Sequence, residues 1–321
     1  MSDITPQELI SRQTKAELYL LACTFVWGGT FVVVKHGLVD SSPFLMVAIR
    51  FGIAALLFLP FSYRSLLKFD HGVVVKGLIL GLLLFAGFAA QTVGLQYTTA
   101  SKSGFITGML VVFTPIFQLV IERRPPKIGN LIGVLFVSVG LFLLTSPQGA
   151  EFNRGDVLTL VCAILFALYI VYLDIFTKAY DVSQLTLLQM VVTIGLACVC
   201  ALVWEQPHFK LTLSLALSIG YLSILATLVT LSLQTRYQKD TTPTRAAIIF
   251  SLEPVISAVL AYSIENENIG RLGAAGGAII VVGLLTSELS DFIFPFGKKR
   301  DCSNSGNWSD EGSKISGQIG H

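Results

Sequence analysis

Ten long apolar runs dominate this sequence and restrict what the chain can fold into. A helix crosses the hydrocarbon core of a bilayer with about 20 mainly apolar residues. Lipid offers no hydrogen bonds to the backbone, so runs of this kind become membrane-spanning helices. The expected spans cover residues 18–38, 44–62, 73–95, 103–121, 128–145, 156–174, 183–203, 211–233, 245–263 and 269–287.

The apolar character extends along most of the 321 residues, of which 53% are hydrophobic and only 13% are charged. Soluble domains average about 25% charged residues. We therefore expect an all-α integral membrane protein of ten transmembrane helices and not a soluble domain with an anchor. The five cysteines show no metal-ligand spacing, and the sequence has no phosphate-binding glycine loop. No cofactor, metal or nucleic-acid partner is expected.

Basic residues predict the orientation, because cytoplasmic loops carry an excess of Lys and Arg. Of the 22 basic residues, Arg50 lies inside the second span and sixteen lie on the side of the two termini. The remaining five lie on the opposite side: Lys35, Lys102, Arg154, Lys210 and Arg271. This distribution predicts a multi-pass protein of the cell (inner) membrane with a cytoplasmic N-terminal segment, 1–17, and a polar cytoplasmic tail, 291–321.

The chain also repeats itself at an offset of 143 residues. "QTVGLQYTTASKSGF" begins at Gln91 and "QTRYQKDTTPTRAAI" begins at Gln234, and both contain a Gln-Thr pair, a Thr-Thr pair and then a basic residue, Lys102 or Arg245. Nearer the N-terminus the offset is close to 139. Hydropathy does not require these polar matches, so they indicate a true internal repeat.

The repeat divides the spans into two units of five, residues 18–147 and 148–290. Because five is an odd number, the second unit enters the membrane in the opposite sense to the first. Inverted repeats of this kind, related by a pseudo-two-fold axis in the membrane plane, are typical of secondary transporters. Such carriers bind their substrate near the midplane, between the two halves.

These segments also carry a family resemblance. "FVWGGTFVVVKHGL", "VAIRFGIAALLFLP", "LQYTTASKSGFITGMLVVFTP" and "TTPTRAAIIFSLEPVISAVLAY" resemble the EamA-type repeats of the drug/metabolite transporter superfamily, over roughly residues 16 to 290. The resemblance implies ten spans, cytoplasmic termini, and export or exchange of small metabolites, often amino acids or related compounds. The substrate does not transfer with the fold.

Glu253 and Pro254 stand near the middle of the ninth span, where a charge and a helix-breaking residue are both costly. Glu253 could face a cavity and bind an amine or a proton, or it could be a neutral structural group bonded to a neighbour. Pro254 removes a helix hydrogen bond, and Pro115 lies in the related helix of the first half. Both prolines are predicted helix breaks.

Arg50, in the second span, could bind a substrate carboxylate. The alternatives are an ion pair that joins two helices, or a head group that reaches the outer surface. The repeat mate of Arg50 is Gln189, which is polar without being charged.

Aromatic and amide side chains complete the candidate set. Trp27 and Thr30 flank two glycines in the middle of the first span, and Tyr169 and Tyr172 lie near the corresponding place in the second half. They could line a substrate cavity or pack as ordinary core residues. The repeat mates Gln91 and Gln234 could form paired gates near opposite faces, or they could simply be polar helix ends.

These features predict a secondary transporter that moves a small organic metabolite, as a monomer or homodimer, with protons as a candidate coupling partner. The alternatives are a lipid-head-group flippase and a membrane-embedded enzyme. A flippase would need a basic groove open to lipid, and an enzyme would need a nucleophile or metal cluster near an interface. The sequence shows neither.

Overall fold

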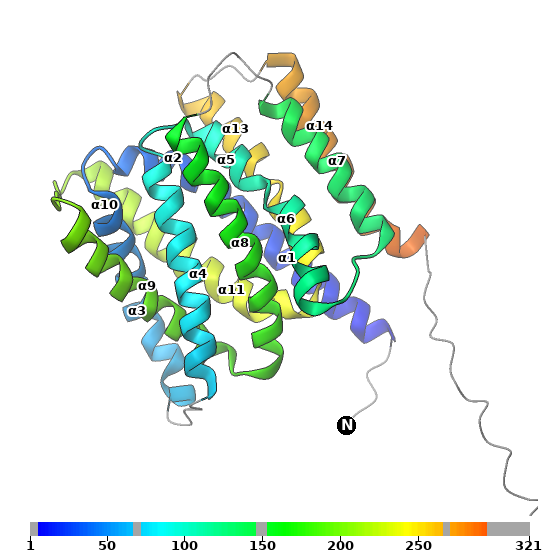
Figure 1. Cartoon of the computed structure of the whole chain (residues 1–321), viewed down its shortest axis with the longest axis horizontal. Coiled ribbons are helices and arrows are strands. Elements are labelled where there is room, and N and C mark those ends of the chain that lie inside the picture. The colour runs from blue at the N-terminus through cyan, green and yellow to red at the C-terminus, as the bar shows by residue number, and fades with distance from the viewer. Residues whose placement is uncertain (1–5, 67–71, 146–152, 266–269, 294–321) are drawn as a thin grey trace, which may run out of the picture.

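The computed structural model describes residues 6–66, 72–145, 153–265 and 270–293, and in these residues every secondary-structure element is a helix, without a β-strand (Figure 1). Nine helical segments of the described chain are long and apolar enough to cross a membrane. The expected fifth span is a shorter apolar helix in the same place. The all-α membrane fold predicted from the sequence is therefore confirmed.

The first half contains spans one to five. Span two is α3 (Pro43–Leu66), span three is α4 (Gly72–Gly94) and span five is α7 (Ile128–Thr145). Spans one and four are interrupted. Span one consists of α1 (Pro6–Gly28) and α2 (Thr30–Gly37), and span four consists of α5 (Ala100–Gly108), α6 (Leu110–Phe117) and the π-helix η1 (Gln118–Glu122).

The second half contains spans six to ten. Spans six, seven and ten are the single helices α8 (Arg154–Ala179), α9 (Val182–Trp204) and α14 (Gly270–Ile293). Span eight is divided into α10 (Leu213–Gly220), a π-helix η2 (Tyr221–Val229), α11 (Thr230–Tyr237) and the 3-10 turn η3 (Gln238–Asp240). Span nine is divided into α12 (Pro243–Phe250) and α13 (Glu253–Glu265).

The breaks in spans four and nine fall at matching places in the repeat. Met109 separates α5 from α6, and Ser251 and Leu252 separate α12 from α13. At the offset of 143, Met109 corresponds to Leu252. Pro254 follows its break directly, as predicted, because proline is tolerated in the first turn of a helix.

Pro115 does not mark the break that was predicted for it. It lies inside α6, six residues after Met109. The break instead coincides with a close approach between the halves, since a Cβ added at Gly108 would lie 2.9 Å from Cγ of Pro254. The helix α6 continues through Pro115, from Leu110 to Phe117.

Spans five and ten show the symmetry most directly. A Cβ at Gly133 would lie 2.9 Å from the carbonyl oxygen of Gly283, and one at Gly140 would lie 2.7 Å from that of Gly276. Gly133 and Gly276 are repeat mates, as are Gly140 and Gly283. Each contact thus joins one residue to the mate of the other, which is the pattern that a two-fold axis produces. In Figure 1, α7 and α14 lie side by side at one edge of the bundle.

The repeated Thr-Thr pair has a local role. Thr99 and Thr242 are the N-caps of α5 and α12, and their hydroxyl oxygens accept from the backbone N–H of Lys102 at 3.1 Å and of Arg245 at 3.3 Å. Threonine suits this position because its hydroxyl satisfies one of the free N–H groups at a helix start. The sequence repeat therefore encodes matching starts for spans four and nine.

The basic residue of each repeat forms an ion pair with a carboxylate of the other half, and the first threonine donates a hydrogen bond to the same carboxylate. In the Lys102 clasp, Nζ of Lys102 lies 2.6 Å from a carboxylate oxygen of Asp156, and the hydroxyl of Thr98 donates to the other oxygen at 2.8 Å. The Asp156 side chain is fully buried. This clasp joins span four to span six.

The Arg245 clasp is its symmetric counterpart. Nε of Arg245 lies 3.2 Å from a carboxylate oxygen of Glu17, which also accepts from the Thr241 hydroxyl at 3.1 Å. Glu17 and Asp156 are repeat mates at the offset of 139. This clasp joins span nine to span one. Because spans four and nine are five spans apart, the two clasps lie at opposite faces of the bundle.

Candidate functional site

A cavity of about 60 Å³ lies between the two halves, beside the breaks in spans four and nine. Side chains from spans one, two, three, four, six, eight and nine contribute to its wall. The lining residues are Trp27, Thr30, Phe51, Leu84, Phe88, Gln91, Leu110, Phe166, Tyr169, Ile170, Ala226, Thr227, Leu231, Gln234, Phe250 and Glu253.

The wall of this cavity follows the internal symmetry. Most lining residues form pairs that the offsets of 139 and 143 relate, so equivalent positions of the two halves meet at one place. The pairs are Trp27 and Phe166, Thr30 and Tyr169, Leu84 and Thr227, Phe88 and Leu231, Gln91 and Gln234, and Leu110 and Glu253. A site on the pseudo-two-fold axis is the arrangement that secondary transporters use.

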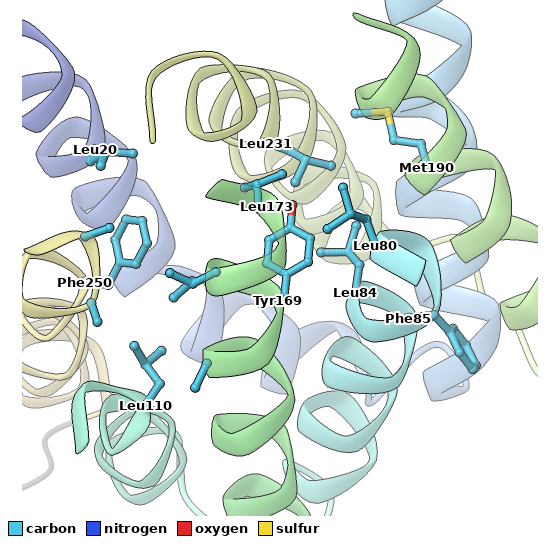
Figure 2. Close-up of a cluster of buried hydrophobic side chains, with 14 of the residues drawn as sticks. Leu20, Leu80, Leu84, Phe85, Leu110, Tyr169, Leu173, Met190, Leu231 and Phe250 are labelled. Atoms are coloured by element: carbon cyan, nitrogen blue, oxygen red, sulfur yellow. The ribbon is translucent and has the colours of Figure 1, made fainter. Parts of the chain in front are cut away.

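Figure 2 shows part of this wall. Tyr169 projects from α8, with Leu110 and Phe250 on one side and Leu84 and Leu231 on the other. The Tyr169 hydroxyl donates to Oε1 of Gln189 at 2.9 Å. This part of the wall is therefore mostly apolar, and the Tyr169 hydroxyl has a specific partner in Gln189.

Glu253 is the first residue of α13 and is 9% exposed. Its carboxylate forms no hydrogen bond or ion pair with the described part of the chain, and it interacts electrostatically with Arg50. The N-terminus of a helix favours a negative charge, so the break before α13 is a suitable place for a carboxylate. Its repeat mate, Leu110, begins α6 in the same way but carries no charge.

Arg50 lies behind the wall and is not one of the lining residues. Its side chain is 3% exposed. Nε donates to the Thr227 hydroxyl, and Nη2 donates to the Ala226 carbonyl at 2.9 Å. The guanidinium also stacks on Phe88, with its carbon 4.5 Å from the ring centroid. Of the roles considered from the sequence, these contacts favour a structural link between spans two and eight.

Trp27 and Thr30, the two candidates in span one, both line the cavity. The indole N–H of Trp27 donates to the Ala226 carbonyl at 3.1 Å, the same oxygen that Arg50 reaches. Ala226 belongs to η2, where the π-helical bonding departs from the α-helical pattern. Thr30 donates from its hydroxyl to the carbonyl of Trp27 at 2.7 Å.

Gln91 and Gln234 both line the cavity. Nε2 of Gln234 donates to Gln238 at 2.9 Å, and Nε2 of Gln91 lies 3.5 Å from the Thr107 hydroxyl. The structure thus places them with the substrate-cavity candidates, and their role as gates stays a prediction.

Two other candidates lie outside the wall. Tyr172 packs against Phe176 with ring centroids 5.6 Å apart. Gln189 does not line the cavity, but it accepts from Tyr169 and donates to the Thr235 hydroxyl at 3.2 Å. Tyr172 is one turn away from Tyr169 on α8, so the rotation of that helix decides which tyrosine faces the cavity.

Sequence reasoning did not identify ten of the lining residues, and four of these are phenylalanines. Phe51, Phe88, Phe166 and Phe250 all line the cavity. A single phenylalanine in an apolar helix gives no signal by itself. The repeat offset would have found Phe166, because it is the mate of Trp27.

No group of three His, Cys, Asp or Glu side chains that could hold a metal ion occurs among the residues with described positions.

Comparison with known proteins places these features in context. The model of the EamA-like transporter family matches residues 14–146 and again residues 153–288. An uncharacterized transporter of Archaeoglobus fulgidus is 32% identical over 274 residues, which cover 85% of this chain and 86% of that protein. The uncharacterized inner membrane transporter YedA of Escherichia coli strain K12 is 23% identical, over 86% of this chain and 91% of that protein.

One solved crystal structure has the same fold. It superposes with a TM-score of 0.72 at 18% identity and covers 86% of this chain and 97% of that one.

Proposed function

The chain belongs to the EamA-like transporter family, and from this premise we propose that it moves a small organic metabolite by alternating access. An amino acid or a related compound is the proposed substrate, and export is the proposed direction. The chain is a multi-pass membrane transporter. Its relatives carry transporter names, so an enzymatic role is not proposed.

The observation that carries the mechanism is the cavity wall built from repeat mates. A carrier that works by alternating access must expose one site first to one face and then to the other. Inverted halves provide two symmetry-related conformations in which the same site opens in opposite directions. The pairing of Gln91 with Gln234, and of Leu110 with Glu253, supports a site that both conformations share.

The two clasps are the proposed gates. Each joins the first half to the second, at opposite faces, and both are closed in this structure. With both clasps closed, the small cavity volume fits an occluded state. Opening of one clasp would separate spans four and six, and opening of the other would separate spans nine and one.

Glu253 is the proposed proton-coupling residue. It is the one carboxylic acid among the residues that line the cavity. A carboxyl group in an apolar wall is costly when charged and unpaired, so a proton and a substrate can compete for it. Competition for one group is sufficient to couple substrate export to proton entry.

We propose that both termini lie in the cytoplasm. The sixteen basic residues on that side support this orientation. Protease should remove a C-terminal tag in inside-out vesicles and leave it intact in right-side-out vesicles. Cleavage in the right-side-out vesicles alone would reverse the assignment of the two faces.

The transporter function is tested by counterflow in proteoliposomes. Vesicles are loaded with one unlabelled class of solute (amino acids, amines, sugars or nucleosides), and entry of a labelled tracer of that class is followed. Transient accumulation with one class, absent from protein-free vesicles, is the expected result. If folded protein exchanges none of the classes, the proposed function is wrong.

A further inference from the structure

The charge of the cavity wall is one-sided, and this feature indicates what kind of solute the cavity can hold. Among the lining residues, Glu253 is the one carboxylate, and none is Lys, Arg or His. The remaining polar groups are hydroxyls and amides. The carboxylate has no hydrogen-bond partner in the described part of the chain. A solute cation is the partner that would offset its burial.

Arg50 cannot supply the missing positive charge to a solute. Its guanidinium donates to Thr227 and Ala226, and Phe88 covers one of its faces. All three of these residues belong to the cavity wall, so they stand between Arg50 and the interior. A solute carboxylate in the cavity would therefore form no hydrogen bond with Arg50, whose donors bind Thr227 and Ala226, and it would also be repelled by Glu253.

Two of the symmetry-related pairs in the wall combine a polar residue of the second half with a leucine of the first. At the position where the second half presents Glu253, the first half presents Leu110. Where the second half presents Thr227, the first half presents Leu84. A solute with one polar end and one apolar end matches this difference, with its polar end toward the second half.

The apolar part of the wall is rich in aromatic rings. Six of the lining residues are aromatic, and Phe166, Phe250 and Trp27 are among them. Aromatic faces attract an ammonium group and also pack against an apolar or aromatic body. Both interactions are compatible with the same solute.

We propose that the cavity selects a small organic amine without a carboxylate, whose ammonium group binds Glu253 and whose apolar or aromatic body packs against the rings. This proposal rests on the proposed transporter function and narrows its substrate class, from amino acids and related compounds to the amines. An α-amino acid carries the same ammonium group, but its carboxylate would be buried without a partner. The cavity therefore discriminates against the zwitterion.

Three ligands that share one ring test the proposal. Phenethylamine is a cation, phenylalanine adds a carboxylate to it, and 3-phenylpropanoate carries the carboxylate alone. Binding of each to the purified full-length protein is measured by titration calorimetry. Phenethylamine should bind at least about tenfold more tightly than phenylalanine, and 3-phenylpropanoate should not bind measurably, because the cost of burying an unpaired charge falls on the carboxylate. Equal or tighter binding of phenylalanine, or no binding of phenethylamine, overturns the proposal.

A matched pair of variants identifies the responsible group. Glu253→Gln should weaken the binding of phenethylamine at least about tenfold and so reduce its preference over phenylalanine, because the carboxylate partner of the ammonium group is gone. Asp181→Asn should keep the wild-type preference. Asp181 is the N-cap of α9 and does not line the cavity, and asparagine caps a helix equally well. If the Glu253→Gln protein is folded and keeps the preference, Glu253 does not determine the specificity.

Counterflow distinguishes a failure of the proposed amine selectivity from a failure of the proposed transporter function. Exchange of phenylalanine or a sugar, with no binding of phenethylamine, would overturn the amine selectivity and leave the carrier intact. Tight binding of phenethylamine without exchange of any solute would support the amine selectivity and contradict the transporter function.

Discussion

Replacement of Glu253 by glutamine is expected to lower proton-driven transport about a hundredfold, which corresponds to about 3 kcal/mol, within the range for the loss of one partner of a buried charge interaction. Glutamine has nearly the same shape as glutamate, so the cavity wall keeps its form. It cannot take up a proton or hold a cation as a carboxylate does. The measurement is the initial rate of substrate movement in proteoliposomes as a function of the imposed pH gradient.

The control for this experiment is Asp181→Asn, which removes a carboxylate at a helix cap away from the cavity. Its transport should resemble that of the unmodified protein. A Glu253→Gln protein that keeps its transport rate and responds to the pH gradient as before would remove Glu253 from the coupling role.

The two clasps are expected to respond to mutation in mirror fashion. Asp156→Asn removes the ionic partner of Lys102, and Glu17→Gln removes that of Arg245. Loss of a buried ionic partner destabilises the closed form of that clasp. Each variant should therefore open the cavity to one face of the membrane and not to the other. In the proposed orientation, Asp156→Asn opens the outer face and Glu17→Gln opens the cytoplasmic face.

Side-specific labelling measures this response. A single cysteine replaces Thr30, which lines the cavity, in a protein otherwise freed of cysteine. A membrane-impermeant thiol reagent is then applied to one side. Asp156→Asn should raise the labelling rate from the outer side about tenfold, and Glu17→Gln should raise it from the inner side, a shift typical of coupled conformational changes. Each variant is the control for the other. Increases from the same side in both variants would show that the clasps are not opposed gates.

The symmetric clasps also explain why the internal repeat is detectable in the sequence at its polar residues. Thr98 and Lys102 match Thr241 and Arg245 because each pair contacts a carboxylate of the other half in the same way. Polar residues of this kind are not interchangeable within an apolar helix, so their spacing survives in the sequence. The repeat is not detectable at the leucines and phenylalanines between them, because many apolar side chains can face lipid or the core equally well.

By itself, the sequence determined the ten spans, the two five-span repeats and the membrane position of Glu253. These features follow from hydrophobic length and from counting, since an apolar run must cross the bilayer and an odd number of spans must invert the second repeat. The number of spans and the inversion of the second repeat do not depend on how each helix is rotated about its own axis. The position of the break beside Pro254 is equally local, because proline acts on its own helix.

Only the tertiary structure decided which side chains face the cavity. Tyr169 lines it and Tyr172 does not, although both lie on α8 and both are tyrosines. Arg50 is turned away toward Ala226, and the break in span four falls at Met109 and not at Pro115. Helix rotation is set by close packing between helices, such as Gly108 against Pro254, and such contacts join residues far apart in the chain. In lipid, helices pack against the neighbours whose surfaces fit theirs, and hydropathy does not predict this fit.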